Sequence, residues 1–363
     1  MKQTPLHSLH SQRAAKMAEF QGWMLPLQFG DPADEHHAVR ASAGLFDASF
    51  LGRIELAGKG AEALLQKYFT RNVAALTEGS AKYGLLCSKT GHILDNVLVF
   101  KLPPDLPGKR FLITTNAIST DKVFALFQDH AGKDTKVTDL SASLVQFALQ
   151  GPKADAVLEA LAGAHFKKVK PKQARTLTLG EVSAIVSRTG FTGERGYELF
   201  LPSDHAASLW NACLAAGKSL GLLPCGMTCR DILRLEAGYV MYGNDIDETR
   251  SPVEAGLLSV VNMNVDFLGR TAIAKHKAEG AKDALVGFEL MDKGLPKPGA
   301  PIFSESREIG VATSAVHSFH CRKDIGLGYL SIRYAQPGLE IEVEVKDREI
   351  AARIIELPFY KRK

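Results

Sequence analysis

Hydrophobic positions recur with two different spacings along the first three quarters of the chain. Spacings of three and four residues predict helices at residues 10–20, 60–68, 120–130, 153–161, 204–219 and 228–238. Short apolar runs bounded by turn residues predict strands at residues 82–87, 93–101, 111–115, 144–149, 183–186 and 197–201. Because helices and strands are interleaved, the sequence predicts an α+β fold with mixed layers.

The pattern changes after Gly280. Short strands are predicted at residues 285–290, 309–314 and 340–345, and glycine and proline rather than helices separate them. Such a run predicts an all-β domain at the C-terminal end of the chain. Earlier in the chain, residues 101–108 carry three prolines, which cannot donate to a strand ladder, so a loop is expected there.

Three glycines at steps of three stand between two of the predicted strands. The segment from Ser187 to Glu198 reads S-R-T-G-F-T-G-E-R-G-Y-E. A turn so rich in glycine marks either a strained bend or a place where the backbone approaches a ligand closely. The dinucleotide fingerprint has the spacing G-x-G-x-x-G and leads into a helix, so a nicotinamide site is disfavoured. Glu198 follows the turn and is expected to point into the same space.

Composition narrows the class of protein. With 363 residues, of which 45% are hydrophobic, the chain suggests two or three domains. No apolar run reaches about 18 residues and the start has no secretory apolar core, so we expect a cytoplasmic protein without a membrane partner. Cys225 and Cys229 lack the second pair that a zinc site needs, so reduced thiols and no metal are expected. The net charge of +4 favours an acidic partner over nucleic acid, because no long basic run interleaves with aromatic residues.

Several separated segments accompany the glycine turn along the chain, at residues 4–6, 22–26, 35–40, 44–47, 83–96, 149–152, 229–238, 242–245 and 358–360. Together with the turn, they resemble the glycine cleavage system T-protein family, the aminomethyltransferases, over nearly the full length of the chain. Their order and spacing carry the resemblance.

The resemblance implies an architecture and an activity. It implies a three-domain folate-binding T-protein architecture: a folate-binding domain in two pieces (1–50 and 140–275), an inserted α+β domain (51–139) and a C-terminal β-barrel (276–363). The implied reaction transfers a one-carbon unit from the aminomethyl-lipoyl arm of H-protein to tetrahydrofolate, with release of ammonia. Lipoylated H-protein would be the partner and tetrahydrofolate the co-substrate, with no metal.

Glu198 and Arg230 match the family's pterin-binding positions. The pterin edge shows an N–H and an amino group beside a carbonyl, so a carboxylate that accepts two bonds and a cation that donates one would recognise it. The alternatives are a solvent-facing strand carboxylate for Glu198 and a helix-surface ion pair for Arg230. Arg234 and Glu236 are interpreted as structural.

Three more residues are candidates for contact with the folate. Tyr83 matches the family's position for an aromatic ring against the pterin, and its alternative is a half-buried strand tyrosine. Asn116 ends a predicted strand and matches the asparagine of the family's V-V-N-A run, although it would also suit a turn. Tyr242 is a further candidate, with a core position as its alternative.

Two departures from the family pattern fall in this site. The family carries two adjacent aspartates, and this chain has Asp95 followed by Asn96. An amide can bond to the folate but cannot hold a proton or stabilise positive charge as a carboxylate does. Neighbouring strand side chains point to opposite faces, so only a bulge would let Asp95 substitute. Phe191 stands where the family has tyrosine, which removes one hydroxyl.

Two other functions stay open. One is a tetrahydrofolate-dependent demethylase of another methyl donor. The other is a non-catalytic folate-binding assembly or regulatory protein, which is disfavoured because the K-G-C-x-x-G-Q-E run of that branch is missing. His317 and His320 resemble a metal pair, but the sequence offers no matching carboxylate, so the pair is interpreted as incidental.

Overall fold

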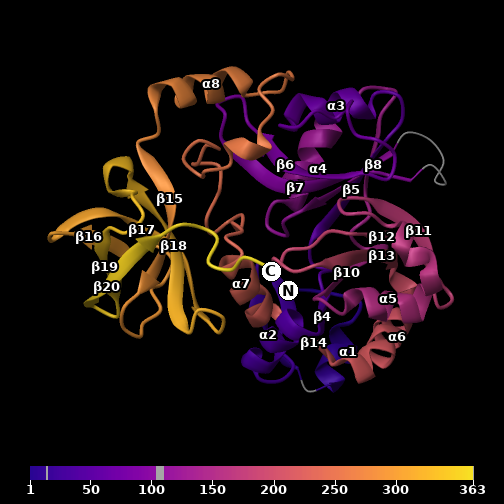
Figure 1. The fold of residues 1–363 in the computed structure, drawn as a ribbon. Helices are drawn as coiled ribbons and strands as arrows, with labels where there is room; N and C mark the ends of the chain where they lie inside the picture. Colours follow the sequence, from indigo (N-terminus) through magenta and orange to yellow (C-terminus); the bar gives the residue numbers. More distant parts are fainter. Residues whose placement is uncertain (14, 104–109, 363) are drawn as a thin grey trace.

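The computed structural model describes residues 1–13, 15–103 and 110–362, and it confirms the α+β fold (Figure 1). Within these residues the strands form a three-stranded sheet, a six-stranded sheet, a five-stranded sheet and a closed six-stranded barrel. The barrel lies on one side of the molecule, and the two larger sheets lie one above the other on the opposite side. No helix of the described residues is long and apolar enough to cross a membrane.

The six-stranded sheet combines two distant pieces of the chain. Its strands are β4 (Ala43–Asp47), β10 (Leu144–Gln150), β11 (Ala174–Leu179), β12 (Val182–Ser187), β13 (Gly196–Pro202) and β14 (Leu222–Pro224), in the order β11-β12-β13-β10-β4-β14. Helices α5 (Ala154–Ala162) and α6 (Ala206–Gly217) supply side chains to the same core, in which Trp210 packs against Phe147. The central strands β13, β10 and β4 are almost entirely buried, which matches their apolar sequences.

The five-stranded sheet is formed by a continuous part of the chain. Its strands are β5 (Gly52–Ala57), β6 (Ala81–Cys87), β7 (Ile93–Lys101), β8 (Arg110–Thr115) and β9 (Lys136–Asp139), in the order β6-β7-β8-β5-β9. Helices α3 (Ala61–Tyr68) and α4 (Thr120–Asp129) pack on it. The buried residues of α3 are Ala61, Leu64, Leu65 and Tyr68, which lie three and four residues apart and so share one side of the helix.

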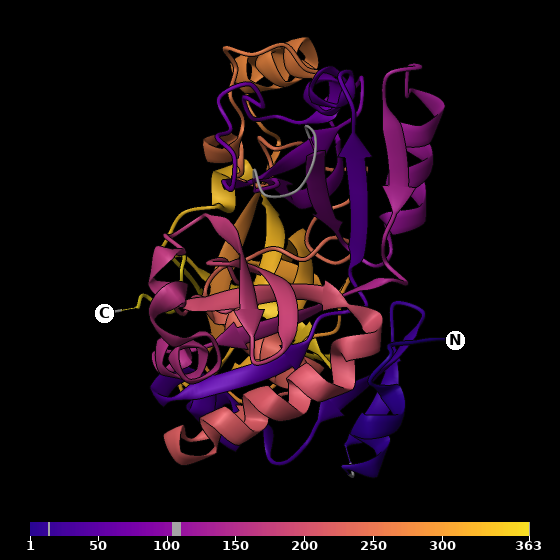
Figure 2. The same ribbon diagram turned by 90° about the vertical axis from the view of Figure 1, so that its right-hand side faces the viewer.

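The barrel contains all three strands predicted after Gly280. Its strands are β15 (Asp283–Leu290), β16 (Pro301–Ser304), β17 (Arg307–Ser318), β18 (Lys323–Ser331), β19 (Glu340–Val345) and β20 (Arg348–Ile355). Pairing of β15 with both β18 and β20 closes the barrel and leaves no free edge. Helix α8 (Arg270–Glu279) precedes it and lies at the top of the molecule in Figures 1 and 2.

The helix predicted at residues 10–20 is wrong. The chain there forms α1 (His7–Gln12) and then β2 (Lys16–Phe20), which pairs with β3 (Trp23–Gln28); β1 (Lys2–Gln3) adds to the other side of β3. Gln21 and Gly22 both have positive φ, 48° and 84°, as a type I′ hairpin turn requires. The hairpin pairs Phe20 with Trp23, and this strand pairing overrides the helix preference of the segment.

Helix α7 (Met227–Glu236) joins the barrel to the sheets. Ile232 and Leu235 pack against barrel residues, whereas Cys229 and Leu233 pack in a cluster that includes Val39 of α2 (Pro32–Ala41). Figure 1 shows α7 and α2 between the barrel and the six-stranded sheet. The helix therefore places its side chains where the parts of the molecule meet.

The other predicted elements are present with shifted ends. The helix expected at 204–219 is α6 flanked by short 3₁₀ turns, and the loop expected at 101–108 falls largely outside the described residues. Sheet membership follows the chain: the five-stranded sheet uses residues 52–139, and the barrel uses 283–355. On this basis we propose the domain boundaries expected from the sequence: a first domain in two pieces (1–50 and 140–275), an inserted domain (51–139) and the barrel domain (276–363).

Candidate functional site

The glycine turn is shaped around the side chain of Gln150. Its Nε2 donates to the backbone oxygens of Thr189 and Tyr197 at 3.1 and 3.2 Å. A Cβ added at Gly190 would lie 1.9 Å from the Oε1 of Gln150, and one at Gly196 would lie 2.5 Å from a backbone oxygen. Gly193 has a φ of +81°. Close approach therefore requires two of the glycines, and backbone conformation favours the third.

Glu198 lies directly after this turn, on β13. It is 9% exposed, which excludes the solvent-facing alternative. Nε2 of Gln146 donates to one of its carboxylate oxygens at 2.7 Å, and the Thr189 hydroxyl donates to the other. Burial raises the pKa of Glu198, while these hydrogen bonds and the charge of Arg230 oppose the shift. Each oxygen keeps a lone pair for a further donor.

Arg230, on α7, lies among aromatic rings. Its guanidinium carbon is 4.7 Å from the ring centroid of Phe191 and 5.6 Å from that of Phe50. Burial lowers its pKa to about 10, against the stabilising charge of Glu198, so it remains a cation at neutral pH. The ion pair within this run of the helix joins Asp231 to Arg234 at 2.7 Å, and the Arg234 side chain is buried rather than on the helix surface.

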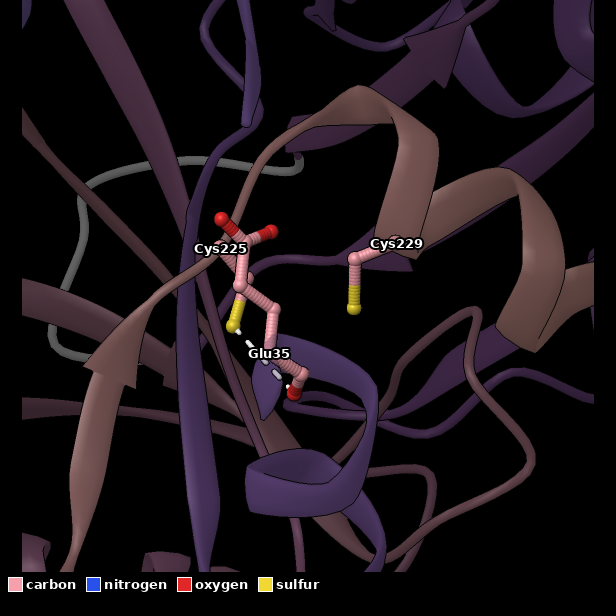
Figure 3. A group of neighbouring side chains, drawn as sticks. All are labelled: Glu35, Cys225 and Cys229. Carbon is pink, nitrogen blue, oxygen red and sulfur yellow. Dashed lines mark hydrogen bonds between the residues drawn. The ribbon is translucent and has the colours of Figure 1, made fainter. Parts of the chain in front are cut away.

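The start of α7 is held by a buried group on α2, drawn in Figure 3. One carboxylate oxygen of Glu35 accepts the backbone N–H of Gly226 at 2.9 Å, and the other accepts those of Phe29 and Gly30. Gly226 must be glycine because a Cβ there would lie 2.1 Å from a backbone oxygen. This tie fixes the first turn of the helix that carries Arg230.

Two thiols complete the group in Figure 3. The thiol sulfurs of Cys225 and Cys229 and a Glu35 oxygen lie within 4.8 Å of one another. Burial raises the pKa of the Cys225 thiol well above its usual range, so the thiolate that a metal prefers is disfavoured. Both Glu35 oxygens already accept backbone N–H groups. These three side chains therefore fit a hydrogen-bonded structural contact better than a metal centre.

Tyr83, Asn96 and Asn116 form a second group, on the five-stranded sheet. Nδ2 of Asn96 donates to the Tyr83 hydroxyl at 3.1 Å, and Nδ2 of Asn116 donates to Oδ1 of Asn96 at 2.8 Å. Tyr83 is 37% exposed and Asn96 is 8% exposed. Although the side chain as a whole is partly exposed, burial around the Tyr83 phenol group raises its pKa to about 12, so it stays protonated and can donate. The structure therefore brings these three predicted residues together.

Asp95 lies behind this group and is fully buried. Its carboxylate accepts hydrogen bonds from the Ser119 hydroxyl at 2.6 Å and from both backbone and side chain of Asn116. The pairing of β6 with β7 shifts register between Leu86 and Cys87, next to Asp95. At this irregularity, the Asn116 amide donates to the side chains of both Asp95 and Asn96. Burial raises the pKa of Asp95 to about 6, in spite of these donors.

Within the described residues, the Tyr242 hydroxyl makes no hydrogen bond to the other predicted site residues, although burial, and to a smaller extent the charge of Asp95, raise its pKa. The side chain is buried in a hydrophobic cluster, and its hydroxyl accepts from Nζ of Lys122 at 2.8 Å. The core alternative describes its surroundings better. His317 also has a partner that sequence analysis missed, because its Nδ1 lies 2.6 Å from a carboxylate oxygen of Asp324.

Tyr239 connects the two groups, although sequence analysis did not select it. Its ring centroid is 5.6 Å from that of Phe191, and its side chain is 40% exposed. It also lies near enough to Tyr83 to contribute, after burial, to the raised pKa of that phenol. An exposed aromatic residue after α7 is a weak signal in a sequence. Gln146 gave a stronger signal, as the one polar residue in the run L-V-Q-F-A-L.

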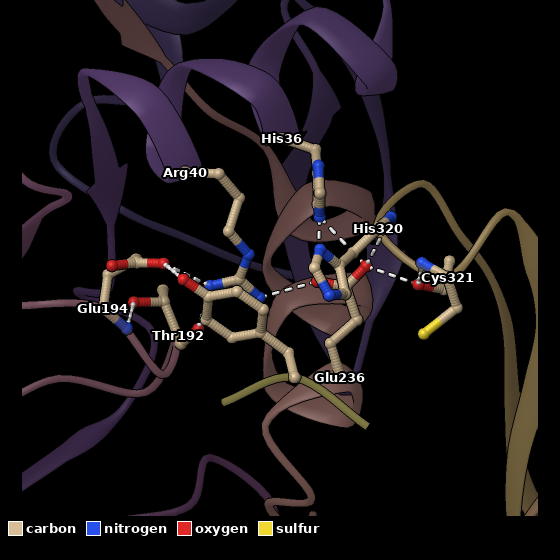
Figure 4. A network of polar contacts seen from close by, with 9 residues as sticks. His36, Arg40, Thr192, Glu194, Glu236, His320 and Cys321 are labelled. Carbon is tan, nitrogen blue, oxygen red and sulfur yellow. Dashed lines mark hydrogen bonds and ion pairs between the residues drawn. The ribbon is translucent and has the colours of Figure 1, made fainter. Parts of the chain in front are cut away.

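A network of ion pairs anchors the site to the rest of the molecule (Figure 4). Arg40 of α2 donates to Glu236 of α7 at 2.6 Å and to the turn residue Glu194 at 3.0 Å. His36 and the barrel residue Ser318 also bond to Glu236. Near the end of the chain, Tyr360 stacks 3.8 Å from the Arg40 guanidinium and donates to Glu194. The glycine turn is thus fixed to helices, barrel and C-terminal segment together.

The combined arrangement suits a flat heterocycle with donor groups on one edge. Glu198 offers acceptors for that edge, and Arg230 offers donors beside it. The rings of Phe191, Tyr239 and Tyr83 offer surfaces for stacking. Among these groups we find none that forms a nucleophile and base pair, so the arrangement favours positioning over covalent catalysis.

Comparison with known proteins gives a consistent result. Residues 6–265 match the family described as GCVT N-terminal domain, and residues 284–361 match the glycine cleavage T-protein C-terminal barrel domain. Proteins named aminomethyltransferase from Anoxybacillus flavithermus and Halothermothrix orenii are 40% and 41% identical, covering 100% and 99% of this chain and 99% and 100% of their own. The crystal structure of glycine cleavage system aminomethyltransferase T from Bartonella henselae has a TM-score of 0.91 at 31% identity, covering 99% of this chain and 98% of its own.

Proposed function

We propose that this chain, which belongs to the glycine cleavage T-protein family, moves the one-carbon unit of an aminomethyl-lipoyl arm to tetrahydrofolate. Its full-length relatives are named aminomethyltransferases, and the chain is an aminomethyltransferase. The aminomethyl donor in the proposal is lipoylated H-protein, whose acidic surface would suit the net charge of +4. A cytosolic location accords with five free cysteines.

The observation that carries the proposal is that Arg230 lies near enough to Glu198 for its charge to oppose the burial that raises the pKa of that carboxyl, with its guanidinium 4.7 Å from the ring centroid of Phe191. Glu198 would accept the N–H and amino group of the pterin edge, and Arg230 would donate to its carbonyl. The Phe191 ring lies beside the guanidinium and is available to the flat pterin. Tyr83, Asn96 and Asn116 would contact the ring nitrogens and the start of the tail.

The reaction needs alignment more than acid or base strength. In the proposed step, N5 of tetrahydrofolate attacks the methylene carbon, ammonia leaves, and N10 closes 5,10-methylenetetrahydrofolate while the arm is left as dihydrolipoyl. The rate then depends on holding N5 against the carbon and on excluding water. The Asn96 amide can hold the folate in place without supplying a charge.

Turnover and binding test the proposal separately. Purified chain should form methylenetetrahydrofolate from aminomethylated H-protein in a steady-state assay, and methylated amines or sulfonium donors should give none. The departure at Asn96 favours one rival, a tetrahydrofolate-dependent demethylase. Folate binding without H-protein-dependent turnover, together with activity on a methyl donor, would establish that rival.

Glu198→Ala tests the folate site itself. Loss of the carboxylate strands two donors of the pterin edge, so tetrahydrofolate binding should weaken by about 2 to 4 kcal/mol. Calorimetric titration measures the change, and circular dichroism checks that the variant is folded. Wild-type affinity in a folded Glu198→Ala protein would remove Glu198 from the site.

A further inference from the structure

Gln146 is a buried polar residue in a strand that is otherwise apolar. It lies on β10, where it pairs with Phe200, and it has no exposed surface. Its Nε2 donates to a carboxylate oxygen of Glu198 at 2.7 Å. Gln146 and Gln150 lie four residues apart on β10, so their side chains are on the same face of the strand. Two buried amides therefore lie beneath the glycine turn.

The other end of the same amide has no partner. Oε1 of Gln146 is buried without a hydrogen-bond donor, whereas Oε1 of Gln150 accepts the Thr192 hydroxyl at 3.0 Å. An unsatisfied buried oxygen destabilises the fold, and an apolar side chain of similar size would avoid that cost but would remove the donor to Glu198. Packing alone therefore does not explain the residue. The bond to Glu198 is what the amide provides.

We propose that Gln146 is a positioning residue that fixes the Glu198 carboxylate and keeps it as an acceptor for the folate. The inference rests on the proposed function, because it assumes that Glu198 binds the pterin edge. With Gln146 on one oxygen and Thr189 on the other, rotation of the carboxylate is restricted and one lone pair of each oxygen is left for the ligand.

The surroundings of Glu198 decide the direction of a pH effect. The groups that face it are Arg230, a cation on α7, and the neutral donors Gln146 on β10 and Thr189 in the turn. Burial raises the pKa of Glu198, and without the amide donor fewer interactions oppose this effect. The carboxylate then protonates at a higher pH. A protonated Glu198 carries a hydrogen on one oxygen, which then opposes a donor of the pterin edge instead of accepting it. Folate binding should then fail at a higher pH than in wild type.

Gln146→Met is the test, since methionine is close to glutamine in size and has no donor. Tetrahydrofolate affinity is titrated by calorimetry between pH 5 and 8 for wild type and variant. We expect about tenfold weaker binding at pH 7 and an acid midpoint about one pH unit higher. The thermal unfolding midpoint at pH 7 should fall, because the buried Glu198 carboxylate loses one donor, and the fall should shrink at acid pH, where Glu198 is protonated in both proteins. A variant with an unchanged pH profile and unchanged affinity overturns the inference.

Gln150→Met is the matched control, because it removes the same chemical group from the same face of β10. Gln150 bonds to the backbone of the turn and to Thr192, and none of these groups titrates. Its loss should lower the unfolding midpoint and weaken binding equally at every pH. If both variants weaken binding without a shift in the acid midpoint of folate binding, Gln146 is structural and the inference fails. A wild-type protein that binds no folate would overturn the proposed function instead.

Discussion

At the scale of single residues, the pair Asp95 and Asn96 distinguishes this chain from the family pattern. The Asn116 amide bonds to both side chains, so the buried carboxylate stands directly behind the amide that faces the site. Asp95 is surrounded by donors and has no free lone pair to spare for a ligand without losing one of them. Its carboxylate holds Asn116 and Ser119, and in the proposed function Asn96 would meet the folate.

Substitution at Asn96 separates hydrogen bonding from charge. Asn96→Asp should keep or raise the glycine-cleavage rate within about a hundredfold, the lower range for one positioned proton-transfer group. Asn96→Ala should lower the rate, because neither bond nor charge remains. Steady-state formation of methylenetetrahydrofolate measures both. An alanine variant as fast as wild type would show that the amide takes no part.

Asp95 gives a pH dependence of its own. Its pKa is about 6, so the carboxylate is ionised at neutral pH and becomes protonated as the pH falls through that value. Protonation would weaken its bonds to Asn116, and the rate should fall below about pH 6. Asp95→Asn should lower the rate at pH 7 and flatten that acid limb. The pH profile of turnover checks this, and an acid limb near pH 6 that persists in the variant would assign it to another group.

At the scale of elements, the glycine turn and Gln150 form one unit. The amide occupies the space that side chains at Gly190 and Gly196 would take. Because Gln150 is itself held by three hydrogen bonds, it cannot move aside at little cost. The spacing of the glycines is therefore set by a side chain on the neighbouring strand as much as by the turn.

Gly190→Ala should disturb this unit. The added methyl would meet the Gln150 amide, so the variant should be about 1 to 3 kcal/mol less stable, the usual range for overpacking. Tetrahydrofolate affinity should fall with it, since Glu198 follows the turn. Gly132→Ala is the control, as a Cβ there meets nothing within 4 Å. Urea unfolding of both proteins measures the difference, and equal stabilities would contradict the packing argument.

At the scale of the whole molecule, Glu236 joins parts that are far apart in sequence. It accepts hydrogen bonds from α2 and from the barrel, while Arg40 extends the connection to the glycine turn and Tyr360. Partners of this kind hold the pKa of Glu236 near 2, although burial alone would raise it. The arrangement of barrel and sheets thus depends on a charge.

This charge predicts a loss of stability in acid. A folded pKa depressed from 4.5 to about 2 contributes about 3 kcal/mol that is present above pH 4.5 and is lost as the pH falls toward 2. Glu236→Gln should therefore destabilise the protein more at pH 7 than at pH 3. Urea unfolding at the two pH values tests this, with Glu340→Gln in an exposed barrel pair as the control. Equal losses at both values would refute the linkage.

The sequence by itself determined the α+β class, the C-terminal barrel strands, the glycine turn and helix α7. These features rest on local signals, because periodicity and turn residues act over a few neighbours. The resemblance in turn selected Tyr83, Asn96, Asn116, Glu198 and Arg230, which the structure places in two adjoining groups.

Only the tertiary structure decided the rest. Residues 16–20 became a strand because the turn at Gln21 and Gly22 brings β3 against them. Gln146 is visible in the sequence as a polar residue in an apolar run, but only the meeting of distant strands with α7 assigns Gln146 and Tyr239 to the site. Asp95 lost its free face to Ser119 and Asn116, which lie more than 20 positions away. Contacts between distant residues depend on how the sheets pack, and packing follows from the whole chain rather than from any segment of it.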